Sequence, residues 1–173
     1  MSSDGAEPIW AGRVSGGTIV NDRLIAILFE IIKSLRRVSG RTRLMKMVYL
    51  VDLMTAQKTG HAALGIKWSG YVSGPFSNEV INTLAHMDGR YIEEEWYTDI
   101  YGDRHYIYSI PEGGPALNPP HLNDPLIERI LSQVIKKWGE RPLAELVDYV
   151  YTTKPFQNSG LGIDIKLESE VAR

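Results

Sequence analysis

The 173-residue chain contains no cysteine. That absence excludes disulfide frameworks, thiolate nucleophiles, iron–sulfur clusters and cysteine-ligated zinc. Long hydrophobic runs are also missing, since the longest, around residues 24–28 and 50–54, are far shorter than the about 20 residues that a membrane-spanning helix needs. Residues 1–17 are small, polar and glycine-bearing, unlike a signal peptide. We therefore expect a cytoplasmic protein that does not enter a membrane.

Motifs that carry chemistry are equally scarce. The four histidines, His61, His86, His105 and His121, show neither i,i+4 pairing on a predicted helix nor an HExxH pattern. The sequence has no glycine-rich phosphate loop and no G-x-S-x-G nucleophile elbow. We therefore predict no metal, no cofactor and no catalytic residue, so that the protein is not an enzyme.

Charge is distributed unevenly along the chain. Residues 1–75 hold 10 Lys and Arg against 5 Asp and Glu, whereas residues 76–173 hold 9 against 16. Such a division either pairs the two halves within one fold or steers a charged partner.

Hydrophobic periodicity predicts five helices. They cover approximately residues 21–37, 42–58, 77–87, 124–138 and 142–150. The second is apolar on most sides, which is typical of a helix at the centre of a bundle. We expect Thr42 and Ser77 to be the N-caps of the second and third helices, and Gly60 to close the second.

Short aromatic and β-branched runs predict the strands. Residues 66–72 form one strand, broken by Gly74–Pro75, and residues 91–98 and 104–110 form a hairpin. Glu93, Glu94 and Glu95 are interpreted as a solvated edge that discourages aggregation. The predicted fold class is α+β, mainly α: a five-helix bundle with a small antiparallel sheet or β-hairpin at one side, winged-helix-like in part. We expect a flexible N-terminal arm (1–17), one globular domain (18–156) and an extended C-terminal tail (157–173).

A basic cluster lies where the first helix ends and the second begins. Its members are Arg36, Arg37, Arg41, Arg43 and Lys46. Five cations within eleven residues are able to bind phosphate or an acidic partner surface. Alternatively, the first two complement the negative C-terminal end of the first helix and the others are solvated.

The segment from the second to the third helix resembles the core of the Panacea (SocA-like) antitoxin and adaptor family. The resemblance rests on Arg43-Leu-Met-Lys-Met-Val-Tyr-Leu-Val-Asp52, Lys58-Thr-Gly60 and Gly74-Pro-Phe-Ser77, and it covers approximately residues 20–156. Ser73 stands where the family usually has tyrosine, and the stretch ending in Pro155-Phe156 replaces a Thr-His motif that ends in Pro-Trp.

This resemblance implies a non-catalytic protein-interaction domain that neutralises a toxin or delivers it to a protease. The alternative from topology is a winged-helix-like DNA-binding regulator, with nucleic acid as the second choice of partner. The predicted third helix lacks Lys and Arg, which disfavours that alternative. The predicted partner-binding face combines the basic cluster with the turn of Gly74, Pro75, Phe76 and Ser77, in which Phe76 is either an interface anchor or a hydrophobic staple against Ile81.

Overall fold

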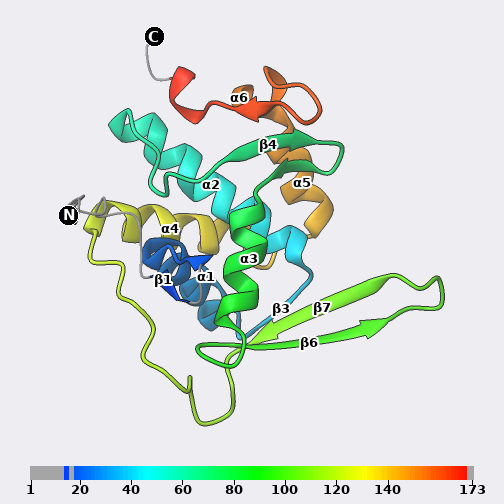
Figure 1. The fold of residues 1–173 in the computed structure, drawn as a ribbon. Coiled ribbons are helices and arrows are strands. Elements are labelled where there is room, and N and C mark those ends of the chain that lie inside the picture. The colour runs from blue at the N-terminus through cyan, green and yellow to red at the C-terminus, as the bar shows by residue number, and fades with distance from the viewer. Residues whose placement is uncertain (1–13, 16–17, 171–173) are drawn as a thin grey trace, which may run out of the picture.

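The computed structural model describes residues 14–15 and 18–170, and within them the fold is α+β (Figure 1). The helices are α1 (Asp22–Leu35), α2 (Arg41–Thr59), α3 (Asn78–Met87), α4 (Pro125–Trp138), α5 (Leu143–Thr152) and α6 (Lys154–Gln157), followed by the 3-10 helix η1 (Leu167–Glu170). The strands are β1 (Val14–Ser15), β2 (Thr18–Ile19), β3 (Arg37–Ser39), β4 (Trp68–Tyr71), β5 (Gly74–Phe76), β6 (Glu93–Thr98), β7 (Arg104–Ser109) and β8 (Asp164–Ile165). The four-residue α6 makes six α-helices where five were expected. Most of the predicted arm, residues 1–13 and 16–17, lies outside the described part.

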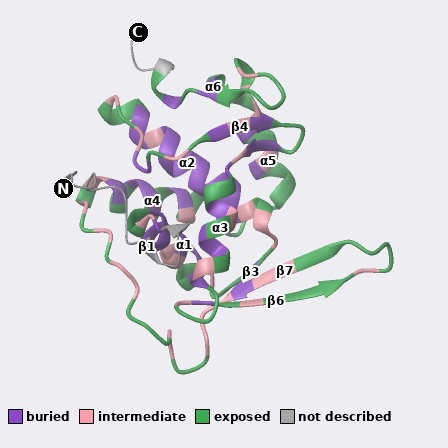
Figure 2. Cartoon of the chain, viewed as in Figure 1, coloured by how far each residue is buried: buried purple, intermediate pink, exposed green. Residues whose placement is uncertain are grey.

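Helix α2 runs through the centre of the molecule, as its sequence predicted. Twelve of its side chains are buried, and Figure 2 shows it as the most continuously buried helix. Gly60 ends it in the left-handed conformation with φ 85°, which confirms the expected stop. Its start differs, because Gly40 occupies the N-cap position and Thr42 lies inside the first turn.

Helices α1 and α4 pack against α2 through their apolar stripes. Asn21 caps α1 by accepting a hydrogen bond from the backbone N–H of Leu24. Asp124 caps α4 in the same way, with Pro125 in the first turn, and the helix covers the predicted residues. Helix α1 ends at Leu35 rather than near residue 37, because Arg36 adopts φ 66° and turns the chain into a strand.

That strand, β3, creates a three-stranded sheet with the order β3-β7-β6. Val38 of β3 pairs with Tyr108 of β7 in antiparallel register. The expected hairpin is confirmed as β6 and β7, joined by the turn 99–103. Only the root of the hairpin is anchored by β3, so the remainder projects from the body (Figure 1).

A second sheet with the order β5-β4-β8 packs along α2, where Lys46 contacts Pro75 of β5 and Asp52 contacts Trp68 of β4. The predicted strand 66–72 is present as the shorter β4, but Gly74 and Pro75 do not simply break it. They begin β5, which turns back to pair with β4.

The C-terminal residues 157–170 are not an extended tail outside the domain. Ile165 and Leu167 are 7% and 5% exposed, and β8 pairs with β4 through Trp68 and Ile165. Two apolar side chains in a proline- and glycine-punctuated segment were too weak a periodic signal to predict this packing.

Candidate partner-binding site

The predicted basic cluster is divided by the fold. Arg36 and Arg37 are exposed at the turn from α1 into β3, whereas Arg41 and Arg43 are half-buried and Lys46 is buried. The three cations on α2 make contacts within the molecule, so they do not form one open cationic surface with the other two.

Arg41 fastens the root of the hairpin to the start of α2. Its Nε donates to Tyr108 Oη at 2.9 Å, and its guanidinium lies 3.5 Å from the centre of the Tyr106 ring. Its terminal nitrogen Nη2 lies 3.8 Å from Glu94 Oε2. This carboxylate oxygen is buried and has no hydrogen-bond partner in the described residues. Arg41 therefore balances a buried carboxylate and positions the hairpin.

Arg43 closes the C-terminal end of α4. Its two terminal nitrogens donate to the backbone carbonyls of Trp138 and Arg141, at 2.8 and 2.7 Å. A guanidinium at a helix C-terminus satisfies carbonyls that have no partner in the helix. This geometry gives Arg43 a structural role.

Lys46 links the central helix to the Gly74–Pro75 turn. Its side chain is 2% exposed, and Nζ donates to the carbonyl of Pro75 at 2.8 Å. Burial lowers the pKa of Lys46 to about 8. Gly74 has φ 101°, and a Cβ there would lie 3.0 Å from Lys46 Cε and 3.3 Å from the Tyr151 ring. A glycine is required at this position both for its conformation and for the close approach of these side chains.

The other two residues of the turn, Phe76 and Ser77, also contact side chains within the fold. Phe76 is half-buried and makes an edge contact with the exposed Tyr71, their ring centres 5.4 Å apart. Ser77 occupies the N-cap position of α3, as expected, but its hydroxyl donates to Glu79 Oε2 at 2.7 Å instead of capping a backbone amide. Phe76 is therefore the side chain of this turn that remains partly accessible to a partner.

Two tyrosines that were not predicted as site residues join the C-terminal helices to α2 and to the β4–β5 turn. Tyr49 Oη and Thr153 Oγ1 lie 2.8 Å apart, and Tyr151 Oη donates to the carbonyl of Val72 at 2.6 Å. Tyr151 also stacks on Phe156, with ring centres 5.3 Å apart. Burial raises the pKa of Tyr49 to about 12. The segments quoted for the family resemblance thus hold α2, β5 and the α5–α6 corner together.

Asp52 is a second buried charge on α2. Its carboxylate accepts hydrogen bonds from Trp68 Nε1 at 2.8 Å and from the backbone N–H of Leu64 at 3.0 Å. Burial raises the pKa of Asp52 to about 6, and these hydrogen bonds oppose the shift. The residue fixes the loop after α2, and it is fully enclosed.

The β6–β7 hairpin is the most exposed element of the fold (Figure 2). Trp96 and Tyr97 are each 54% exposed, and Ile100 and Tyr101 at the tip are 91% and 84% exposed. Arg104 covers one face of Trp96, 4.0 Å from the ring centre. Exposed aromatic and apolar side chains gathered on a projecting element are typical of an interaction surface.

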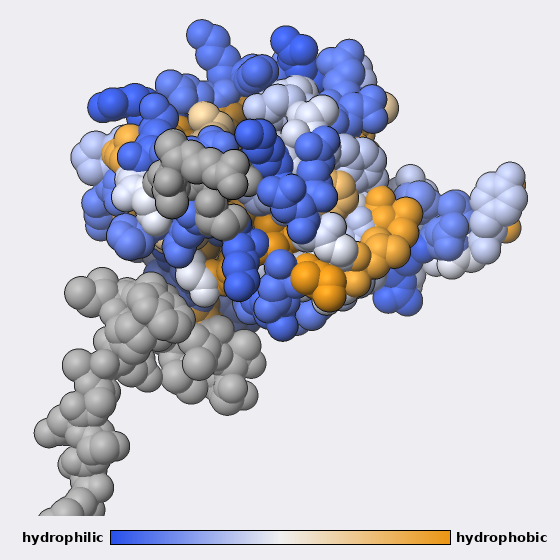
Figure 3. Space-filling model, turned by 90° about the horizontal axis from the view of Figure 1, so that it is seen from above, coloured by the Kyte–Doolittle hydropathy of each residue, from blue (hydrophilic) through white to orange (hydrophobic). Residues whose placement is uncertain are grey.

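A smaller apolar patch lies at the tip of the β4–β5 turn. Val72 is 80% exposed, and Leu161 and Ile163 from the loop before β8 are 71% and 58% exposed. A bridge between Gly70 and Leu161 brings this loop beside β4. Figure 3, viewed from above, shows hydrophobic side chains gathered on the margin of the body that lies toward the hairpin.

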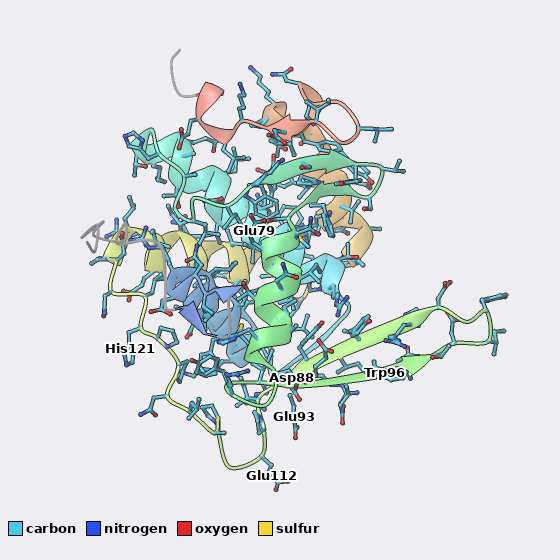
Figure 4. The ribbon with its side chains drawn as sticks, in the orientation of Figure 1. Glu79, Asp88, Glu93, Trp96, Glu112 and His121 are labelled. Atoms are coloured by element: carbon cyan, nitrogen blue, oxygen red, sulfur yellow. The ribbon has the colours of Figure 1, made fainter. Side chains whose placement is uncertain are left out.

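A cleft of about 740 Å³ lies between α1, α4 and the proline-rich loop that precedes α4. Its walls include Glu30, Lys33, Glu128 and His121, the last of which is labelled on the loop in Figure 4. The mixture of charges in these walls points to no single class of ligand.

The described residues contain no group of three or more His, Asp or Glu side chains arranged to hold a metal ion. None of the helices in that part of the chain is both long enough and apolar enough to cross a membrane.

A family model described as the antitoxin SocA-like Panacea domain matches residues 44–156. This range includes most of α2, the Gly74–Pro75 turn, the hairpin and α5. No curated protein and no solved structure matches the chain.

Proposed function

The chain belongs to the SocA-like Panacea family of antitoxin domains, and on that premise we propose that it neutralises a toxin by binding it directly. A role related to a toxin–antitoxin system follows from the family. Three further points are our proposals: that the partner is a protein, that it is a toxin, and that this chain either neutralises it by binding or delivers it to a protease. The family match is the observation that carries them.

We propose that the protein has no catalytic centre of its own. The two buried side chains of α2 that carry a charge, Lys46 and Asp52, have hydrogen-bond partners within the fold and are enclosed by it. Their perturbed pKa values follow from burial. A reacting group must reach its substrate, and these two do not reach the surface. Their arrangement therefore supports a structural function, consistent with a binding domain in the cytoplasm.

Of the partner-binding face expected from the sequence, we retain only the residues that are accessible in the structure. Arg36, Arg37 and Phe76 keep accessible surface, whereas Arg41, Arg43 and Lys46 act within the fold. The projecting hairpin, which the sequence did not indicate as a site, offers more exposed aromatic surface than the Phe76 turn. We therefore place the main contact with the toxin on the hairpin.

The test begins with the chain expressed with an affinity tag in its native host. Proteins that co-purify are identified by mass spectrometry, cloned, and expressed under a tight promoter with and without this chain. We expect one of them to arrest growth alone and to be harmless when the chain is co-expressed. We also expect that pair to form a complex in size-exclusion chromatography. A toxin that is neutralised without forming such a complex would refute direct binding.

A DNA-binding regulator is the weaker proposal. A winged helix would present α3 to the major groove, but α3 carries no Lys or Arg and begins with Glu79 in its first turn. The hairpin that would form the wing is acidic. Binding to duplex DNA that is tight, sequence-specific and steeply salt-dependent would favour the regulator instead.

A further inference from the structure

Strand β6 has a free edge. The sheet order is β3-β7-β6, so β6 pairs with β7 on one side only. The backbone N–H of Asp99 donates inward to Asp103, whereas that of Glu94 donates outward to the Asp88 carboxylate at 2.9 Å. Since inward and outward amides alternate along an antiparallel strand, the amides of Trp96 and Thr98 also point outward. Beyond Glu94, no strand or helix in the described ranges lies along this side (Figure 1).

The side chains of this edge are strongly acidic. Glu93 and Glu95 are exposed on one face of the strand, and Asp103 is exposed in the turn. Figure 4 shows Glu93 and Asp88 at the root of the hairpin and Trp96 farther along it. Within β6, β7 and the turn between them, Arg104 is the single Lys or Arg side chain, and the ring of His105 lies 2.7 Å from the Asp99 carboxylate. Two copies of this edge would repel each other, whereas a strand with Lys or Arg side chains would be attracted to it.

Exposed rings accompany the carboxylates. Trp96 and Tyr97 are consecutive, so their side chains lie on opposite faces of the sheet. Each ring is about half exposed. Arg104 already lies 4.0 Å from the centre of the Trp96 ring, which shows that this ring accepts a guanidinium. The stems and charges of long cationic side chains therefore have contacts available on both faces.

We propose that β6 is the docking edge for an extended, lysine- or arginine-rich segment of the partner protein, which adds to the sheet as a fourth strand. The backbone hydrogen bonds go to the outward groups of Trp96 and Thr98. The cationic side chains lie over Glu93, Glu95 and the two aromatic rings. This proposal rests on the proposed function only in identifying the partner as the toxin.

A defined peptide tests the docking edge without the toxin. The probe is a fluorescein-labelled nonapeptide that alternates lysine with valine, and its control alternates glutamate with valine. Both are titrated with the full chain, and fluorescence anisotropy is measured at low salt. We expect the lysine peptide to bind at least a hundredfold more tightly than the glutamate peptide. Equal affinities, or no binding of the lysine peptide, would overturn the proposal.

Residue-resolved amide exchange shows where the peptide binds. We expect the N–H groups of Trp96 and Thr98 to exchange at least tenfold more slowly when the peptide is bound. The amide of Val72, at an exposed turn of the other sheet, serves as the control and should not change. Binding without protection of the two β6 amides would show a purely electrostatic contact and would refute strand addition.

Variants separate the charge of the edge from its backbone. The double substitution Glu93→Lys and Glu95→Lys should weaken binding of the lysine peptide at least tenfold. Asp148→Lys is the control, because it reverses an exposed acidic charge on α5, outside the β6 edge, and it should leave the affinity unchanged. Thr98→Pro removes one outward amide without removing an inward hydrogen bond to β7, and it should also weaken binding. The proposal would be overturned if all three variants bound the lysine peptide as tightly as the unaltered chain does. If a variant fails to fold, the amide exchange measured on the unaltered chain decides the question.

Failure of this inference is distinguishable from failure of the proposed function. A chain that neutralises its toxin but does not bind the lysine peptide refutes the docking edge alone. A chain that binds the peptide at β6 but neutralises no co-purifying protein refutes the antitoxin function alone.

Discussion

Replacing Lys46 with methionine should remove a specific pH dependence of stability. The folded pKa of Lys46 is about 8, against 10.5 for an unperturbed lysine, because burial disfavours the ammonium form. The unfolded chain therefore binds more protons than the folded chain between these values, so the free energy of unfolding rises with pH in that window. At 1.36 kcal/mol per pKa unit, burying the charge costs about 3 kcal/mol at neutral pH.

The measurable part of this cost lies between pH 7 and pH 9. Over that interval the contribution of Lys46 to the free energy of unfolding should rise by about 1.4 kcal/mol. For a chain of this length, that corresponds to about 4 °C in melting temperature. Higher pH is avoided because ionisation of tyrosines in the unfolded chain then destabilises the fold, given that burial raises the pKa of Tyr49 to about 12.

Urea denaturation of both chains at several pH values is the assay. From pH 7 to pH 9, the unfolding free energy of the unaltered chain should rise by about 1.4 kcal/mol relative to that of Lys46→Met. The absolute difference is less informative, because methionine also removes the hydrogen bond to Pro75. Lys136→Met, at an exposed position of α4, is the matched control and should run parallel to the unaltered chain. Parallel curves for Lys46→Met as well would refute the burial of a charged lysine.

The other predictions concern Asp52, Arg41 and the core. Burial raises the pKa of Asp52 to about 6, so the folded chain binds a proton that the unfolded chain has released. The free energy of unfolding should therefore fall by about 2 kcal/mol as the pH rises from 4 to 7. Asp52→Asn should abolish that part of the slope in denaturant titrations. Arg41→Ala leaves the buried Glu94 carboxylate and the Tyr108 hydroxyl without their partner and should cost about 2 kcal/mol, while Arg36→Ala, at an exposed turn, should change the unfolding free energy by less than about 0.5 kcal/mol. Val48 is fully buried, so Val48→Asp should give a chain without a cooperative thermal transition, and a folded, equally stable variant would show that α2 is not the core.

The elements predicted correctly are those with local signals. Helix α3 was predicted over the same residues that form it, because the Gly-Pro turn before it and the apolar spacing within it lie in one short segment. The hairpin follows from two alternating runs around a turn. Strand β3 was missed because its three residues form a strand only through pairing with Ser109, Tyr108 and Ile107, about 70 positions later in the chain.

The candidate site was harder to predict than the fold. Lysine is almost never fully buried without a partner, so Lys46 was grouped with the surface cations, although Met45 and Met47 on either side of it already indicated a buried helix. The contacts of Arg41 and Arg43 within the fold could not be predicted, because their partners, the hairpin and the end of α4, are distant in sequence. The exposed rings of the hairpin were not recognised because aromatic residues in strands usually pack inward.

The uneven charge of the chain finds a physical explanation in these contacts. In the described residues, ion pairs that join the basic first part to the acidic second part include Arg23 with Asp124, Arg41 with Glu94, and Lys67 with Asp164. Ion pairs within the fold therefore account for part of the uneven charge distribution. On the hairpin, the pair of Arg41 with Glu94 lies at the root. Beyond Glu94, the carboxylates of Glu95 and Asp103 stand on a projecting arm that no basic segment of the described chain covers. Arg41 contacts the root of the hairpin, and beyond the root the arm projects as an acidic edge. In the proposed docking, a cationic partner is attracted first to this arm and then aligned along β6.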